Sequence, residues 1–286
     1  MTLELKGKPV ADQIREEVLR EVEAWKARGI VPKLCTLIVE GDPASLYYAE
    51  AKGRAAEKLG IEYELHKFPA TVSEGLLLDV IGRLNRDPEV HGIMLELPLP
   101  AHLHAPKIAE AILPQKDIDG LHPDNLLAAI KETTGLYPAT PKACIALLTQ
   151  YGHTVKGKHV VMVGRGATVG LPLMHLLLNA GATVTVCTSK TPDLSVHLKQ
   201  ADIAFVAVGR AGLIQPEMVH EGLILIDAGI NETADGKIVG DVSADCLASS
   251  AGLSPTPGGV GTVTTAMLFR NLMDAMDLQI PVKEAR

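Results

Sequence analysis

The sequence predicts an α/β fold in two domains, and three observations lead to this class. The chain has 286 residues, of which 47% are hydrophobic, and this length suffices for two cores because domains commonly have about 100–150 residues. Helical and extended hydrophobic patterns alternate along the first half, which is typical of a parallel sheet covered by helices. After residue 158, short and continuously apolar segments indicate strands that are buried on both faces.

The first half is expected to begin with a helix followed by a strand. Apolar residues recur at near-helical spacing from Val10 to Trp25, and the segment LCTLIV at 34–39 is apolar throughout. The next expected elements are a helix over 43–59, a strand over 61–68, a helix over 73–86 that starts at Ser73, and a strand over 92–97. Residues 98–141 are rich in Pro, His and Gly, so we expect loops there with a short helix around 105–112.

The second half has the pattern of a Rossmann-like, doubly wound parallel sheet. Its expected strands are HVVMVG, ATVTVC, IAFVAVG and LILIDAG, separated by helices or turns. An amphipathic helix is expected over 262–277. We therefore predict a first α/β domain at 1–140, completed by the C-terminal helix at 262–286, a Rossmann-like domain at 141–261, and a cleft between the two domains.

The composition argues against several classes of protein. The net charge of −7 and the sequence pI of about 5.8 argue against a nucleic-acid partner, which needs a basic surface. The four cysteines lie far apart without a CxxC pair, which favours free thiols in a reducing compartment. The first residues are too charged for a signal peptide, and no apolar run approaches the ~20 residues that cross a bilayer. We expect a cytoplasmic protein with no membrane partner.

A glycine-rich turn follows the strand HVVMVG and leads directly into the apolar helix LPLMHLLL. Its glycines, Gly164, Gly166 and Gly170, have the spacing GxGxxxG. Glycines let the backbone approach a pyrophosphate, whose charge is stabilised by free N–H groups at the start of a helix. The strand–turn–helix context therefore favours dinucleotide binding. The alternative is a tight turn in an α/β domain that binds no nucleotide.

The type of dinucleotide is indicated at the end of the next strand. An NAD enzyme usually has an acidic residue there for the ribose hydroxyls, but this chain has no carboxylate between Cys187 and Asp193. Ser189, Lys190 and Arg165 could instead surround a 2′-phosphate with charge-assisted hydrogen bonds. NADP is therefore favoured over NAD. The alternative is that these are ordinary solvated residues of turns.

In the first domain, Tyr48 and Lys52 are candidates for a reactive site. They lie four residues apart on an expected helix, so their side chains share one face. A lysine against an apolar pocket can act as a base, and a phenol can position the reacting group. The pair alone is more often a packed ring beside a solvated amine.

Two acidic positions complete the candidate site. Glu96 is a charge within the apolar segment GIMLELPLP, which is costly unless the carboxylate is paired, and Lys52 is the partner that we suggest. In KDIDGLHP, Asp117 and Asp119 precede Gly120, and one of the two is explained by a turn-forming side chain. The neighbouring histidines have no metal-ligand spacing, so no metal site is expected.

Nine segments, in this order, resemble the methylenetetrahydrofolate dehydrogenase/cyclohydrolase family: GDPASLYYAEAKGRAAEKLGI, GIMLELPLP, KDIDGLHPDN, PATP, VGRGATVGLP, TVTVCTSKT, IDAGIN, GDV and PTPGGVGTVT. The resemblance implies a homodimer with two activities at one folate site. These are NADP-linked oxidation of the methylene bridge of 5,10-methylenetetrahydrofolate to methenyl, and hydrolysis of methenyl to 10-formyltetrahydrofolate. It also implies that residues 1–140 form the catalytic, folate-binding domain.

The resemblance also assigns roles to individual residues. Lys52 resembles the cyclohydrolase lysine, Tyr48 the tyrosine that lines the reacting carbon, and Asp119 the aspartate that anchors the pterin ring. Arg165 and Ser189 resemble the pair that holds the 2′-phosphate of NADP. The remaining expected contacts are Pro257, Gly258 and Gly259 in the loop over the folate, and Gly209 and Ile230 at the cofactor.

Glu96 is the departure from the family pattern with the largest expected effect, because most members have a glutamine there. A carboxylate beside Lys52 stabilises the ammonium form and makes the lysine a poorer base near pH 7, unless Glu96 itself takes the proton. We therefore expect weakened or pH-shifted cyclohydrolase activity. Other departures are Arg54, Ala139, Gly166, Thr188 and Thr262-Val263, where the family commonly has lysine, cysteine, serine, histidine and Pro-Met.

Three alternatives remain open from the sequence. One is a monofunctional dehydrogenase that has lost the hydrolase, which the Glu96 change favours. Another is a non-catalytic folate or nucleotide sensor, against which the retained Tyr48, Lys52 and Asp119 argue. The third is an unrelated NADP dehydrogenase that acts on a small hydroxy or keto acid and does not respond to folate.

Overall fold

The computed structural model describes residues 3–41 and 43–280 and contains two compact units. Unit 1 comprises the chain up to Gln13, Ala129–Glu132 and Pro138–Met267. Unit 2 comprises Ile14–Ala128, Thr133–Tyr137 and the chain from Leu268 onwards. The predicted class, α/β in two domains, is confirmed. The last six residues of the predicted helix range 262–286 lie outside the described residues.

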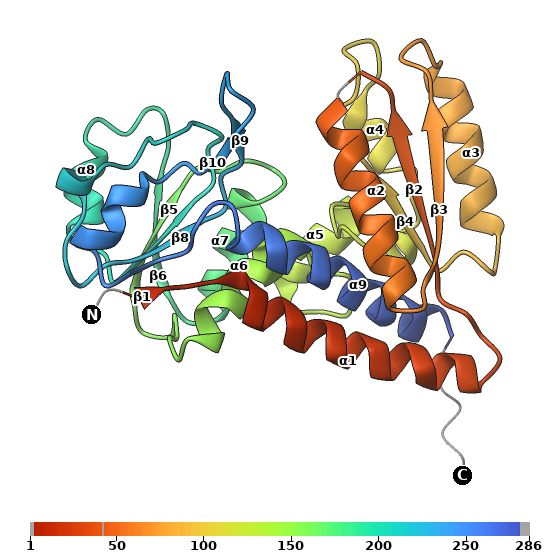
Figure 1. Cartoon of the computed structure of the whole chain (residues 1–286), viewed down its shortest axis with the longest axis horizontal. Coiled ribbons are helices and arrows are strands. Elements are labelled where there is room, and N and C mark those ends of the chain that lie inside the picture. The colour runs from red at the N-terminus through yellow and green to blue at the C-terminus, as the bar shows by residue number, and fades with distance from the viewer. Residues whose placement is uncertain (1–2, 42, 281–286) are drawn as a thin grey trace. The chain divides into compact units, whose positions relative to one another are not determined.

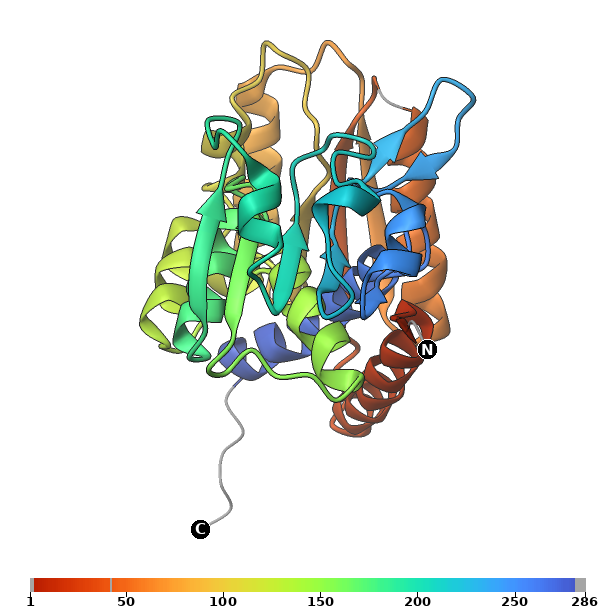
Figure 2. The ribbon, with the colours of Figure 1, turned by 90° about the vertical axis from the view of Figure 1, so that its left-hand side faces the viewer.

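Unit 1 is built on a six-stranded sheet in which every neighbouring pair of strands is parallel (Figures 1 and 2). The strands, in spatial order, are β1 (Leu3–Glu4), β11 (Gly252–Leu253), β8 (Ile224–Asp227), β7 (Ile203–Val206), β5 (His159–Val163) and β6 (Thr183–Cys187). Chain order reverses on either side of β5, because β6 lies on one side and β7 on the other. The predicted doubly wound topology is thus confirmed, with β5 at the switch point.

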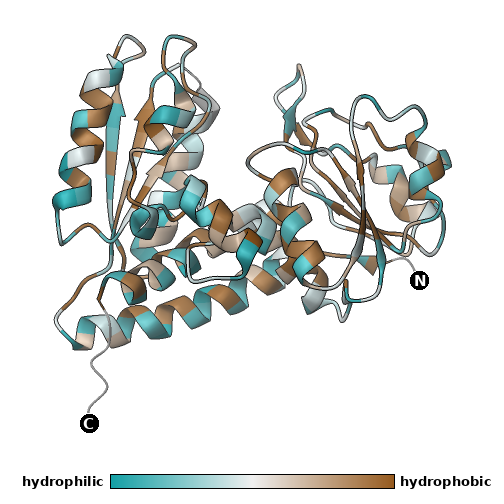
Figure 3. Ribbon diagram, turned by 180° about the vertical axis from the view of Figure 1, so that it is seen from behind, coloured by the Kyte–Doolittle hydropathy of each residue, from teal (hydrophilic) through white to brown (hydrophobic). Residues whose placement is uncertain are grey.

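Apolar side chains explain why the central strands of this sheet are buried. The strands of unit 1 are largely brown, hence hydrophobic, in Figure 3, and β5, β7 and β8 are apolar on both faces. The other elements of this unit include α6 (Ala139–Gln150), α7 (Gly170–Asn179), α8 (Leu194–Leu198), the 3-10 turns η2 (Pro216–Met218) and η3 (Ala244–Ser249), and the hairpin β9 (Asn231–Glu232) and β10 (Ile238–Val239).

Unit 2 has a three-stranded parallel sheet in the order β3 (Glu62–Phe68), β2 (Lys33–Val39) and β4 (Gly92–Leu95). Side chains alternate between its faces. Cys35, Leu37 and Val39 of β2 pack in one core with α3 (Glu74–Arg86) and α4 (Ala105–Ala109). On the other face the Tyr63 hydroxyl donates to the Ala49 carbonyl of α2 (Pro43–Lys58) at 2.9 Å.

The helices α1 (Gly7–Ala27), α5 (Pro123–Lys131) and α9 (Val260–Gln279) each contain a boundary between the units. The predicted first domain starts at residue 1, whereas the chain up to Gln13 groups with unit 1, because β1 pairs with β11. A two-residue strand has no periodic signal by which a sequence could reveal this pairing. Among the described residues, no helix combines the length and apolar character that a bilayer span requires.

One expectation about residues 98–141 needs correction. Residues 98–141 were expected to form loops with a single short helix, but they contain α4, the turn η1 (Pro114–Lys116), all of α5 and the start of α6. Pro123 at the first position and the segment LLAAI were helix signals. Neighbouring Pro, His and Gly residues obscured them.

Candidate functional site

The glycine turn of unit 1 connects β5 to α7 and has two glycines that no other residue could replace without movement. A Cβ atom at Gly164 would lie 2.3 Å from the Ala207 carbonyl oxygen, and one at Gly170 would lie 2.3 Å from the Gly164 carbonyl oxygen. Gly166, in contrast, is exposed and would meet no atom within 4 Å. Open space above a glycine in the turn that precedes a helix is what a pyrophosphate needs. This turn therefore fits a dinucleotide.

The residues expected around a 2′-phosphate lie at neighbouring strand ends. β5 and β6 pair through Val163 and Cys187, and Gly164 N–H donates to the Cys187 carbonyl at 2.9 Å. Arg165 and Ser189 therefore follow two adjacent strand ends and are both exposed. Lys190 is exposed in the same turn, where its N–H donates to the Thr188 hydroxyl at 3.2 Å. These exposed groups are available to an anionic ligand.

The other expected cofactor and substrate contacts of unit 1 lie in loops. Gly209 follows β7 in an exposed loop with φ of +67°, and Ile230 follows β8 with 61% of its surface exposed. An exposed isoleucine beside a strand end can contact a flat ring. The loop containing Pro257, Gly258 and Gly259 is anchored by a backbone hydrogen bond, in which Gly7 N–H donates to the Gly258 carbonyl at 2.7 Å.

In unit 2, Lys52 and Glu96 form a short ion pair. Lys52 Nζ donates to Glu96 Oε1 at 2.6 Å, and the side chains are 18% and 10% exposed. Lys52 comes from α2, whereas Glu96 follows directly after β4. The predicted contact is confirmed, although the strand ends two residues earlier than expected. Tyr48 lies one helical turn before Lys52 and is 43% exposed, so its ring is open to a ligand.

The two aspartates of KDIDGLHP have different environments. The Asp117 carboxylate accepts N–H groups from Gly120 at 3.2 Å and His122 at 2.7 Å, so it is the turn-forming residue. Burial, and next the Asp117 carboxylate, raise the pKa of Asp119 to about 7, while Lys52 lowers it and Glu96 raises it. Asp119 is therefore electrostatically coupled to the Lys52–Glu96 pair. A carboxyl group of this kind can donate or accept a hydrogen bond near neutral pH.

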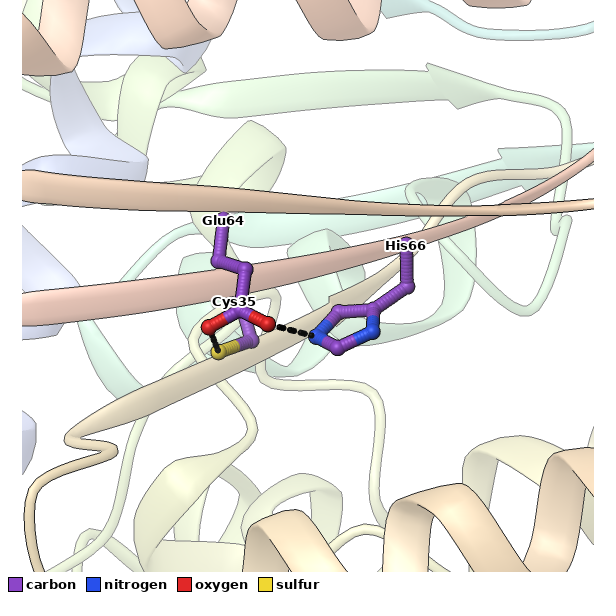
Figure 4. A group of neighbouring side chains, drawn as sticks. All are labelled: Cys35, Glu64 and His66. Carbon is purple, nitrogen blue, oxygen red and sulfur yellow. Dashed lines mark hydrogen bonds and ion pairs between the residues drawn. The ribbon is translucent and has the colours of Figure 1, made fainter.

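Cys35, Glu64 and His66 form a separate cluster on one face of this sheet (Figure 4). Their ligand-type atoms lie within 4.8 Å of one another. However, Lys33 Nζ already lies 3.0 Å from Glu64 Oε2, and burial, followed by the Glu64 carboxylate, raises the pKa of the Cys35 thiol to about 12. The thiol is thus protonated and the carboxylate paired. The cluster is a hydrogen-bonded ion-pair network of the sheet.

Models of known protein families match both units. Residues 5–119 match the catalytic domain of tetrahydrofolate dehydrogenase/cyclohydrolase, and residues 138–280 match its NAD(P)-binding domain. The bifunctional protein FolD of Pelotomaculum thermopropionicum is 48% identical over 98% of this chain and 99% of its own length. The chain belongs to the tetrahydrofolate dehydrogenase/cyclohydrolase family. The resemblance noted from the sequence is confirmed.

Solved structures of the tetrahydrofolate dehydrogenase/cyclohydrolase family have the same fold. The bifunctional methylenetetrahydrofolate dehydrogenase/cyclohydrolase of Campylobacter jejuni has a TM-score of 0.93 at 39% identity and covers 96% of this chain and 99% of its own. The Trypanosoma brucei enzyme, solved with NADP and an inhibitor, has a TM-score of 0.94 at 34% identity, with coverage of 98% and 99%.

Two buried aspartates of unit 1 were not singled out as functional residues by sequence reasoning. Asp227, at the end of β8, accepts N–H groups from Gly229 at 2.8 Å and Val242 at 2.9 Å, and burial raises its pKa to about 6. Asp241 is fully buried and accepts hydrogen bonds from two loops. The available signal was the one used for Glu96, namely a carboxylate at the edge of an apolar strand.

Proposed function

We propose that this chain oxidises 5,10-methylenetetrahydrofolate to 5,10-methenyltetrahydrofolate with NADP and hydrolyses the product to 10-formyltetrahydrofolate. The observation that supports this most directly is that the chain matches both the catalytic domain and the NAD(P)-binding domain of the family. The open glycine turn after β5 supports the dinucleotide.

For the dehydrogenase, the protein mainly positions the reactants. NADP, when bound, accepts the hydride, and the lone pair of a folate nitrogen compensates the charge left on the carbon. We assign the 2′-phosphate to Arg165, Ser189 and Lys190 and the pyrophosphate to the turn at 164–170. Gly209 and Ile230 contact the cofactor. Tyr48, with an exposed ring on α2, lines the reacting carbon, which requires orientation more than acid–base help.

For the cyclohydrolase, Lys52 and Glu96 handle the proton. Water attacks the cationic methenyl carbon and a base removes one proton from that water. The bond from this carbon to N5 then breaks as the second proton of the water passes to N5, which leaves the formyl group on N10. Lys52 Nζ donates to the Glu96 carboxylate at 2.6 Å, so the amine is engaged with a charged acceptor, and this contact must be released before Lys52 can act on the water. Asp119 binds the pterin ring, and the loop Pro257–Gly259 covers the folate. We therefore propose a hydrolase that is weaker near pH 7 than one with glutamine at position 96.

A second candidate function is a monofunctional methylenetetrahydrofolate dehydrogenase. The same Lys52–Glu96 contact favours it, because a lysine held by a charged acceptor at 2.6 Å is less available to the attacking water. The two candidates differ only in whether methenyltetrahydrofolate is consumed faster than in buffer.

We also propose a cytoplasmic homodimer. The family resemblance supports the dimer. The four cysteines support a reducing compartment, because all are free and buried. Light scattering on the purified protein measures the assembly directly.

The proposed function is tested by mixing the purified protein with methylenetetrahydrofolate and either NADP or NAD, and recording methenyl formation and decay by absorbance across pH. Formation with NADP and accelerated decay support both activities. Formation without accelerated decay supports the monofunctional candidate. No formation with either cofactor contradicts the assignment.

A further inference from the structure

A single buried carboxylate in unit 1, that of Asp241, collects four hydrogen bonds from two separate loops. Its Oδ2 accepts backbone N–H groups from Val208 at 2.7 Å and Gly209 at 3.0 Å. Its Oδ1 accepts from Arg210 N–H at 2.7 Å and from the Asn231 side-chain amide at 2.9 Å. The side chain is 0% exposed. Since an ionised carboxylate accepts about four hydrogen bonds and donates none, all its capacity is used here.

The backbone around Asp241 is shaped to admit this carboxylate. A Cβ atom at Gly229 would lie 2.2 Å from its Cγ, so only glycine fits there. Both neighbours of Ile230 lie at this carboxylate: Gly229 packs against it, and the Asn231 side chain donates to it. The carboxylate thus ties the loop after β7, at 208–210, to the loop after β8, at 229–231.

We infer that Asp241 is a positioning residue for the dinucleotide. β7 and β8 are neighbours, and their loops lie at the carboxyl ends of parallel strands, where such sheets bind ligands. Each loop carries one residue that we assign to the cofactor, Gly209 and Ile230, so the inference rests on the proposed function. Asp241 is fully buried, so it does not contact a bound ligand itself. It acts on the cofactor by holding the two loops in one geometry before binding.

The variant Asp241→Asn tests this inference because it keeps the shape of the side chain. Whichever oxygen becomes an NH₂ group then faces two N–H donors, so two hydrogen bonds are lost. We expect the Kd of NADP, measured by calorimetry, and the KM for NADP to rise about tenfold. The KM for methylenetetrahydrofolate should stay within about twofold, since the expected folate contacts of unit 2 are unchanged.

The matched control is Asp235→Asn, at an exposed carboxylate that pairs with Lys237 in the β9–β10 turn. It should leave both KM values unchanged. If Asp241→Asn shows no cooperative unfolding transition, and so is not folded, Asn231→Ala is measured instead. Asn231→Ala removes one donor to Asp241 and leaves its backbone hydrogen bonds in place. We then expect a rise of about threefold in the KM for NADP.

Two results would overturn the inference. One is an unchanged Kd of NADP in a folded Asp241→Asn protein. The other is a parallel rise in both KM values with a lower melting temperature, which indicates a purely structural residue. Wild-type protein that binds no NADP would instead contradict the proposed function.

Discussion

Replacing Glu96 with glutamine should increase the hydrolysis of methenyltetrahydrofolate near pH 7. The Glu96 carboxylate lies 2.6 Å from Lys52 Nζ, and both side chains are mostly buried. Glutamine has nearly the same shape and keeps a carbonyl acceptor, but it carries no charge. The change therefore replaces the charge-assisted hydrogen bond from Lys52 Nζ with a weaker one to a neutral acceptor, without opening a cavity.

The expected gain is roughly tenfold. At 2.6 Å and an effective dielectric constant of about 20, the gross attraction is roughly 6 kcal/mol. Desolvation of the two charged groups offsets most of this attraction. The net value of a hydrogen bond to a charged group is about 1.5–3 kcal/mol, and we take the lower end because glutamine still accepts a hydrogen bond. About 1.5 kcal/mol corresponds to roughly tenfold in the rate of hydrolysis.

The assay follows the absorbance of methenyltetrahydrofolate at several pH values, with the dehydrogenase rate as an internal reference. Glu74→Gln is the matched control, because Glu74 forms a Lys–Glu pair of similar length, 2.7 Å to Lys107, with a lysine that is 60% exposed. It should change neither rate. Equal hydrolysis by wild type and Glu96→Gln at every pH would refute the reasoning, since the carboxylate would then not control the base.

Three further changes probe other parts of the chain. Arg165→Ala should raise the KM for NADP about tenfold or more and leave that for NAD unchanged, because only the 2′-phosphate loses a charge-assisted hydrogen bond; equal effects on both cofactors would contradict this role. Burial raises the pKa of Asp119 from 3.8 to about 7, so the folded protein binds this proton more tightly and loses stability as the pH rises from about 4 to 7, by at most about 4 kcal/mol. Asp119→Asn should flatten this slope in urea unfolding, and an unchanged slope would count against the shift. Gly53→Ala should lower the free energy of unfolding of unit 2 by about 1–3 kcal/mol, since the Cβ atom of the new alanine would lie 2.8 Å from the Tyr63 ring. Gly82→Ala, with its nearest atom at 3.6 Å, should instead stabilise α3 by about 0.5–1 kcal/mol, and the same sign for both would refute the steric argument.

The sequence allowed most strands and long helices to be predicted, because their signals are local. The apolar run at 34–39 corresponds to β2, and Ser73 caps α3 by accepting the Leu76 N–H at 3.3 Å. α5 was missed because its nine residues lie among loop-forming residues. β1 was missed because its two residues become a strand only through pairing with a distant segment.

The candidate site could be predicted only where a residue was anomalous in its own segment. Glu96 was identifiable as a charge in an apolar strand, and its contact with Lys52 is confirmed. The sequence left open which aspartate of KDIDGLHP forms the turn, and the hydrogen bonds of Asp117 answer this. Asp241 had a comparable signal, but the loops that it joins could not be predicted, because its donors come from segments that only the folded sheet brings together.

The pairing of β1 with β11 constrains how the chain folds while it is being synthesised. β1 leaves the ribosome first, but its partner is the last strand of the sheet to be translated. β5 to β8 are close in sequence and can pair early, whereas β1 must wait until a very long loop can close. Weakening β1 would therefore disturb the final step of sheet assembly and leave its nucleation untouched.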